Sequence, residues 1–316
     1  MKGSIYLLIS FLAVVLLSCS SNDRDVNGSS GKGVVNIVAT TGMIADMAAV
    51  IGGDNVVVKG LMGPGVDPHL YKASAGDVAL LSKADVIFYN GLHLEGKMSE
   101  IFEQMNSRGI ETVAVSDGID RSDLLTPPEF KGNHDPHIWF DVTLWMSTVG
   151  SVRNALIEKD PENAPQYNKN AESYLVALSE LNDYVKERAN SLPEDKRVLI
   201  TAHDAFNYFG RGYGFEVKGL QGISTDSEAG TADVKELAAI IVERRIPAVF
   251  IESSVPPRYI EAVQAAVKSK GFDVKIGGEL FSDAMGNPGT PEGNYIGMVR
   301  HNINTIVDAL GHGGES

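Results

Sequence analysis

Two stretches of alternating strand and helix patterns, separated by one long helical segment, dominate this sequence of 316 residues. Short β-branched runs, such as those at 34–39 and 248–252, alternate with segments whose apolar residues recur at helical spacing. This alternation favours parallel sheets covered by helices on both faces. Between the two stretches, residues 160–193 open with an Asp-Pro cap, keep one apolar face and end at a proline, which predicts a helix of roughly 25–30 residues, about 40 Å long.

The predicted fold class is therefore α/β, with two lobes that each contain a mainly parallel sheet flanked by helices. We expect an N-terminal lobe over residues 34–159, a linking helix over 160–193 and a C-terminal lobe over 194–316. A helix of this length between two lobes predicts a rigid strut rather than a loose linker. The two lobes are expected to face each other across a cleft.

The first residues are predicted to be a targeting segment. Lys2 precedes a mainly apolar run over 5–17 that is too short for a comfortable membrane span, so residues 1–18 are predicted to be a signal peptide. Cys19, the single cysteine, follows Leu-Leu-Ser and resembles the lipidated cysteine of a bacterial lipobox. The alternative is an ordinary signal peptide with an incidental cysteine. Residues 19–33 would then hold the lipidated cysteine and a flexible polar tether.

The formal charge of −14 at pH 7 bears on the class of partner. Nucleic-acid binding requires a basic face, so this charge argues against it. Excess negative charge fits a weak attraction for cations, although an ordinary solvated acidic surface is the better explanation for most of it.

The tripeptide Asp-Pro-His occurs twice, ending at His69 and at His137. Proline fixes its own backbone φ angle and pushes the residue before it toward extended geometry. Each histidine is therefore carried on a loop with few conformations to lose. Such loops suit a preformed metal site, because the ordering of ligands costs affinity. We predict that His69 and His137 form half of a metal site.

The second half of the chain offers two further candidate ligands. His203 follows the predicted strand at 198–202, and Asp283 follows the strand that begins at 274. In parallel α/β sheets, ligands bind beyond the carboxyl ends of strands. Any one of these histidines could instead cap a loop or lie on the surface, but the three together with Asp283 favour a metal site. Imidazole and carboxylate ligands suit zinc or manganese.

The other histidines are weaker candidates. His93 has apolar neighbours that favour packing, and His134 is a candidate accessory ligand on a polar loop. His301 is expected on the face of the last helix, and His312 in the tail that follows it.

Four acidic residues are candidates for supporting roles. Asp67 and Asp135 precede His69 and His137 by two residues, so each could hold an imidazole N–H or cap its loop. Similar roles are open to two further acidic residues, Asp204 and Glu252.

Five segments resemble those of a known family. They are GLMGPGVDPHLY (60–71), YNGLHLE (89–95), DPHIWFD (135–141), TAHDAF (201–206) and GGELFSDAMG (277–286). These segments are spread along the chain, and they resemble the cluster A-I, or cluster IX, solute-binding lipoproteins of bacterial metal ABC importers.

The resemblance implies two α/β lobes joined by one long helix, with one divalent ion buried between them. Carried over by motif, the metal ligands are His69 and His137 from the first lobe and His203 and Asp283 from the second. The implied cargo is Zn²⁺ or Mn²⁺, with Fe²⁺ as a further alternative. Manganese-specific relatives tend to carry Glu where His203 stands, and many zinc-specific relatives carry a long His-rich loop that this chain lacks, so the metal stays open.

The function implied is capture rather than catalysis. A protein of this kind is extracytoplasmic, held on the periplasmic side of the cytoplasmic membrane by lipid on Cys19, and delivers metal to the membrane subunits of an ABC permease. We expect a monomer. Two alternatives stay open: an extracytoplasmic zinc-dependent hydrolase with Glu228 or Glu252 as general base, and a binder of a chelated or organic metal ligand.

Overall fold

The computed structural model describes residues 33–130 and 132–311. The predicted signal peptide, Cys19, nearly all of the tether and His312 lie outside these residues. Within the described ranges, no helix has both the length and the apolar character that crossing a bilayer requires. We call residues 34–159 the N-terminal lobe and residues 194–311 the C-terminal lobe; this division, with 160–193 between them, stays a prediction.

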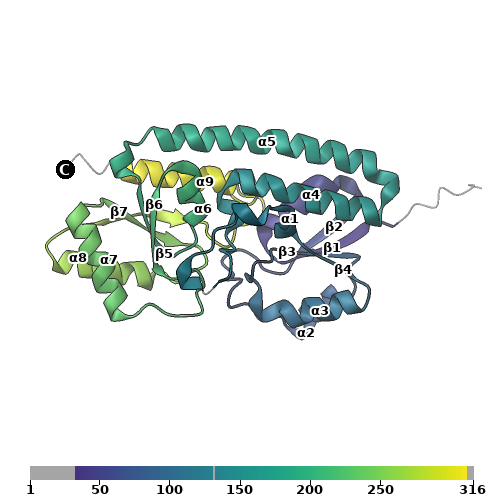
Figure 1. The fold of residues 1–316 in the computed structure, drawn as a ribbon, viewed down its shortest axis with the longest axis horizontal. Helices are drawn as coiled ribbons and strands as arrows, with labels where there is room; N and C mark the ends of the chain where they lie inside the picture. Colours follow the sequence, from purple (N-terminus) through teal and green to yellow (C-terminus); the bar gives the residue numbers. More distant parts are fainter. Residues whose placement is uncertain (1–32, 131, 312–316) are drawn as a thin grey trace, which may run out of the picture. The chain divides into compact units, whose positions relative to one another are not determined.

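The N-terminal lobe contains a four-stranded parallel sheet with strand order β2-β1-β3-β4. Its strands are β1 (Val35–Ala39), β2 (Val56–Gly60), β3 (Val86–Tyr89) and β4 (Glu111–Ala114). Its helices are α1 (Gly42–Gly52), α2 (Ala75–Leu81), α3 (Ser99–Ser107) and α4 (Val142–Lys159). Alternate residues of the central strands face opposite layers: Ile37 packs with α1 and α4, whereas Val38 packs with α3 (Figure 1). The prediction that helices cover both faces of the sheet is confirmed.

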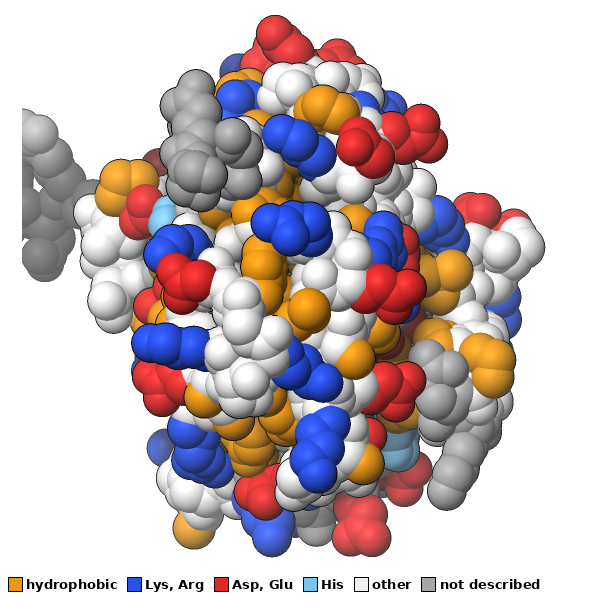
Figure 2. All heavy atoms as spheres, turned by 90° about the vertical axis from the view of Figure 1, so that its left-hand side faces the viewer, with side chains coloured by type: hydrophobic (Ala, Val, Ile, Leu, Met, Phe, Trp, Pro, Cys, Tyr) orange, Lys and Arg blue, Asp and Glu red, His pale blue; other side chains and the backbone are white. Residues whose placement is uncertain are grey.

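The C-terminal lobe repeats this design with two parallel strand pairs. Strand β5 (Val198–His203) pairs with β6 (Glu216–Gln221), and β7 (Ala248–Glu252) pairs with β8 (Lys275–Leu280). The helices are α6 (Asn207–Tyr213), α7 (Thr231–Arg244), α8 (Arg258–Ser269) and α9 (Tyr295–Gly311). Helices α7 and α8 cover one face of these strands. Beyond them, the outer side of the lobe shows acidic and basic side chains interspersed, as on a solvated surface (Figure 2).

Helix α5 (Ala164–Asn190) packs against α1 and α4 of the N-terminal lobe and against α9 of the C-terminal lobe (Figure 1). Its 27 residues confirm the predicted length. The predicted cap is wrong in detail, because Pro161–Asn163 forms a separate turn of 3-10 helix before α5 begins. The carboxylate of Asp160 accepts hydrogen bonds from Asn163 and Tyr167 instead of capping a backbone N–H. The α/β fold class is confirmed.

Candidate metal centre

Four side chains from separate segments meet between the lobes. His69 lies on the loop after β2, His137 directly precedes a 3-10 turn, His203 is the last residue of β5, and Asp283 follows β8. One candidate ligand atom from each lies within 4.8 Å of the others. Their exposed fractions are 3%, 0%, 0% and 2%, so the cluster is shielded from solvent. The four residues selected from the sequence are thus brought together.

The distances in this cluster match the spacing of ligands around one ion. The Nε2 atoms of His69 and His137 are 3.2 Å apart. Oxygens of Asp283 lie 3.4 Å from His203 Nε2, 3.6 Å from His137 Nε2 and 3.9 Å from His69 Nε2. A tetrahedron of ligands at about 2.1 Å from zinc has edges of about 3.4 Å. The cluster is therefore of the right size for a single transition-metal ion.

Two carboxylates determine which nitrogen of each ring faces the centre. Asp135 lies 2.7 Å from Nδ1 of His137, and Glu252 lies 2.5 Å from Nδ1 of His203. When Nδ1 carries the proton and donates it, Nε2 presents a lone pair. Among the described residues, His203 Nε2 and Asp283 Oδ1 are buried and have no hydrogen-bond partner. A buried polar atom without a partner is costly, and a cation at the centre would satisfy both.

The Asp-Pro-His repeats explain how the N-terminal lobe places its two histidines. In each repeat the aspartate accepts a hydrogen bond from the backbone N–H of the histidine, at 2.9 Å for His69 and 3.0 Å for His137. This is an Asx turn, stiffened by the intervening proline. Asp135 therefore caps its loop and holds the imidazole. Asp67 caps its loop, but its second oxygen accepts a hydrogen bond from Thr225 in the C-terminal lobe at 2.6 Å.

Burial and neighbouring charges shift the pKa values of the clustered residues in different directions. Burial lowers the pKa of His69 to about 3, and the neighbouring histidines lower it further against the pull of Asp283. Burial also opposes charge on His203, but the carboxylates of Glu252 and Asp283 outweigh it and raise the pKa of His203 well above 6.5. Burial favours a neutral Asp283, yet His203 and then His137 hold its pKa well below the usual range. At neutral pH the cluster thus contains a carboxylate and an unprotonated His69.

The weaker histidine candidates lie outside the cluster. The Nδ1 atom of His134 is 3.0 Å from the hydroxyl of Thr126, and Nε2 of His301 is 3.0 Å from the backbone oxygen of Glu279. His93 lines a neighbouring cavity and has a left-handed φ of 69°. The predicted packing of His93 among apolar side chains is wrong, because its side chain is exposed.

The acidic candidates take different places. Glu252 is buried against His203, where both its oxygens are occupied by hydrogen bonds. Glu228 lies on the surface, where it accepts a hydrogen bond from Tyr259. Asp204 does not hold His203; its carboxylate accepts a hydrogen bond from Asn207.

Contacts across the lobes were not predicted from the sequence. Thr225 donates to Asp67, and Asn207 donates to Asp135 at 3.2 Å. These partners are 158 and 72 residues apart, so no local pattern links them.

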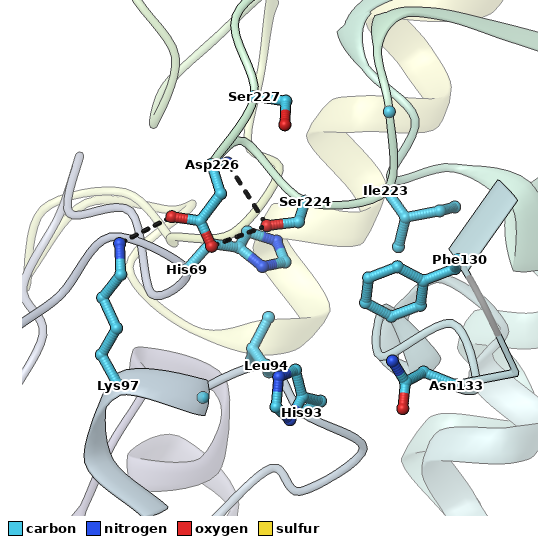
Figure 3. Close-up of a pocket in the computed structure, with 12 residues that line it drawn as sticks. His69, His93, Leu94, Lys97, Phe130, Asn133, Ile223, Ser224, Asp226 and Ser227 are labelled. Carbon is cyan, nitrogen blue, oxygen red and sulfur yellow. Dashed lines mark hydrogen bonds and ion pairs between the residues drawn. The ribbon is translucent and has the colours of Figure 1, made fainter.

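A cavity of about 590 Å³ lies beside the cluster (Figure 3). Of the four clustered residues, His69 lines it. Its other walls come from residues of the segment His93–Lys97 and from Phe130 and Asn133 in the N-terminal lobe, and from residues of the segment Gly222–Ser227 in the C-terminal lobe. The cavity therefore reaches the cluster on the side of His69.

Comparisons with known proteins agree with this arrangement. The profile of the family described as ZnuA, zinc-uptake complex component A, periplasmic, matches residues 37–309. The chain is 50% identical over 299 residues to the zinc-binding protein TroA of Treponema pallidum, covering 95% of this chain and 96% of that protein. It is 46% identical over 310 residues to the manganese-binding lipoprotein MntA of Bacillus subtilis, covering 98% and 100%. A solved structure of the periplasmic zinc-binding protein TroA from T. pallidum matches with a TM-score of 0.86 and 53% identity, over 88% of this chain and 99% of that one.

Proposed function

The chain belongs to the ZnuA family of periplasmic zinc-uptake components, and from that premise we propose that it captures one divalent transition-metal ion through His69, His137, His203 and Asp283. The observation that carries this proposal is the buried cluster itself, in which four donor groups converge within 4.8 Å. The bound ion is cargo, which the protein hands to the membrane subunits of an ABC permease.

Retention rather than catalysis fits the chemistry of this donor set. A catalytic zinc ion usually keeps one coordination position for water. Here four protein groups surround the centre, and both oxygens of Asp283 face it, toward His137 and His203. Glu252 is occupied in holding His203, and Glu228 is on the surface, so neither supports the role of general base. The family is one of solute-binding transport proteins, not of enzymes.

The donor set favours zinc in affinity and admits manganese. Three imidazoles and one carboxylate bind zinc more tightly than manganese or iron(II), following the Irving–Williams order. The similar proteins include one named for each metal, since TroA is named as zinc-binding and MntA as manganese-binding. We propose Zn²⁺ as the most tightly bound ion, with Mn²⁺ as a second cargo and Fe²⁺ as a further alternative.

The membrane attachment follows from the relatives and from the first residues. MntA of B. subtilis is named as a lipoprotein and covers 98% of this chain. We propose that residues 1–18 are removed, that Cys19 carries the lipid, and that residues 20–33 tether the two lobes and the linking helix outside the cytoplasmic membrane. The protein acts as a monomer in this proposal.

The test is metal stoichiometry combined with one ligand substitution. Purified protein, stripped with a chelator and reloaded, is expected to hold one zinc ion per chain. His203→Ala is expected to reduce zinc affinity by about a hundredfold or more, since it removes one of four ligands that together contribute roughly 10–16 kcal/mol. His134→Ala removes a histidine outside the cluster and serves as the control. Unchanged affinity in His203→Ala, or a tightly bound organic chelate in place of a bare ion, contradicts the proposal.

A further inference from the structure

One group of contacts between the two lobes is deeply buried. Tyr208 donates a hydrogen bond to the backbone oxygen of Asp135 at 3.0 Å. Trp139 donates from Nε1 to the backbone oxygen of Ser282 at 2.9 Å, and Tyr295 donates to the backbone oxygen of Trp139 at 2.8 Å. All five residues are buried. On this side the lobes are held by contacts that water cannot readily reach.

The second group is smaller and nearer to solvent. Thr225 donates to Asp67 at 2.6 Å, and the next residue, Asp226, forms an ion pair with Lys97 at 2.6 Å. The side chains of Lys97 and Asp226 are 30% and 54% exposed, so their attraction is screened. Figure 3 shows this ion pair at the cavity, beside His69. We call these two contacts the clasp.

The clasp reaches a metal ligand through Asp67. One oxygen of this carboxylate accepts from the backbone N–H of His69, and the other accepts from Thr225. The position of Thr225 therefore orients the group that holds the backbone of His69. By contrast, His137 and His203 each have ring Nδ1 held by a carboxylate of their own lobe, Asp135 and Glu252 respectively. Asp135 also accepts a hydrogen bond from Asn207 of the C-terminal lobe, at 3.2 Å, but it holds both the backbone N–H and the ring of His137, whereas Asp67 holds His69 by its backbone N–H and accepts the shorter hydrogen bond from Thr225.

The cavity lies where opening of the clasp would have the greatest effect. Its walls include Lys97, Ser224 and Asp226, and it reaches His69 but none of the other three ligands. Separation of the segment Gly222–Ser227 from the N-terminal lobe would widen this cavity and release Asp67 together. His69 would then bind the ion less tightly, at the place where solvent can enter.

We propose that the clasp sets how long the ion is retained: Thr225, acting through Asp67, keeps His69 in place, and Asp226 with Lys97 keeps the segment closed. This inference rests on the proposed metal-binding function. Thr225 and Asp226 act as positioning residues in it, because neither touches the ion. The dissociation rate of the metal, more than its association rate, is the quantity that the clasp controls.

The first test substitutes Thr225. Zinc-loaded full-length protein is mixed with excess chelator, and the dissociation rate is measured by stopped flow. Thr225→Val removes the hydroxyl and is expected to raise the dissociation rate roughly tenfold or more, as a hydrogen bond to a charged group implies, with association changed less than about twofold. Thr225→Ser keeps the hydroxyl and is expected to restore slow dissociation, which a purely steric role of Thr225 would not do.

The ion pair has a control pair of similar geometry within the C-terminal lobe. Asp226→Asn is expected to raise the dissociation rate by only about twofold to fivefold, since the pair is exposed. Glu216→Gln removes a pair with Arg244 that has the same distance, 2.6 Å, and similar exposure, 45% and 38%, but lies away from the cavity. Glu216→Gln is expected to leave the dissociation rate unchanged. An equal acceleration in both variants means that charge alone acts, and overturns the role of the ion pair.

A second readout does not involve the metal. In metal-free protein, hydrogen exchange of the backbone N–H of His69 is expected to be faster in Thr225→Val than in wild type, because Asp67 is no longer held. If wild type binds no metal, the proposed function fails. If wild type binds metal but Thr225→Val releases it at the wild-type rate with unchanged exchange, the clasp is refuted and the proposed function stands. Should Thr225→Val not fold, Asp226→Asn and Thr225→Ser decide between the same outcomes.

Discussion

Glu252 accepts two hydrogen bonds from His203, one from the backbone N–H at 2.8 Å and one from ring Nδ1 at 2.5 Å. This carboxylate fixes the orientation of the ring and its tautomer, and so aims Nε2 at the centre of the cluster. Glu252→Gln preserves the size of the side chain but weakens this hold. Zinc affinity, measured by competition with a chelating dye, is expected to fall about 10–100-fold. Glu228→Gln, on the surface, is the control; equal affinity in both variants contradicts this role of Glu252.

Metal affinity is expected to fall as the pH falls. The pKa of His203 is raised well above 6.5 by Glu252 and Asp283, against burial, so the metal-free protein carries a proton there at neutral pH. The ion must displace this proton, which makes affinity drop about tenfold per pH unit below that pKa. Burial keeps the pKa of His69 at about 3, so this ligand adds no second proton near neutrality. Calorimetry in buffers of different ionisation enthalpy is expected to count about one released proton; a count of zero opposes this assignment.

Metal binding is expected to stabilise the fold. The four ligands are brought together only in the folded protein, so the ion binds the native state and not the unfolded chain. At free zinc of about 100 times Kd, linkage gives about 2.7 kcal/mol of added stability. Thermal unfolding with and without zinc measures this, and excess chelator is expected to return the Tm to the metal-free value. His203→Ala at the same zinc concentration provides the control, with little or no shift. A wild-type Tm that does not change when zinc is added argues against a site formed by folding.

The linking helix is expected to contribute stability without setting metal affinity. Leu178 on α5 is fully buried, whereas Val176, two residues earlier, is 61% exposed. Leu178→Ala is expected to lower the free energy of unfolding by about 2–5 kcal/mol through lost burial and a cavity. Val176→Ala is expected to change it by less than about 0.5 kcal/mol. Denaturant unfolding measures both. Zinc affinity of the folded Leu178→Ala protein is expected to stay at the wild-type value. A large loss of affinity would mean that the helix also determines metal binding, and would contradict this prediction.

The parts of the site that the sequence predicts are those with a local cause. His69 and His137 each follow an aspartate and a proline, and that tripeptide forms its Asx turn wherever the chain places it. His203 ends a strand whose buried run is visible in the sequence, and the strand places it at the sheet edge. The sequence predicts these residues because their backbone geometry depends on near neighbours.

The parts that were missed depend on tertiary contacts. Helix α6 was not predicted, and its Asn207 reaches Asp135 only once the lobes have met. Strands β6 and β8 each run through glycine, which weakens a strand pattern in the sequence. At Gly219 a Cβ atom would lie 2.4 Å from the backbone nitrogen of Asp204, so glycine is required by a close approach of two chain segments that no local pattern reveals.

The most direct test of the account is the location of the ion. A crystal of the zinc-loaded protein, measured at the zinc absorption edge, gives an anomalous difference map that places the metal without assumptions about its ligands. We predict one peak per chain, about 2.0–2.2 Å from Nε2 of His69, His137 and His203 and from a carboxylate oxygen of Asp283. A peak elsewhere, or one contacted by residues of a single lobe, would contradict the central claim.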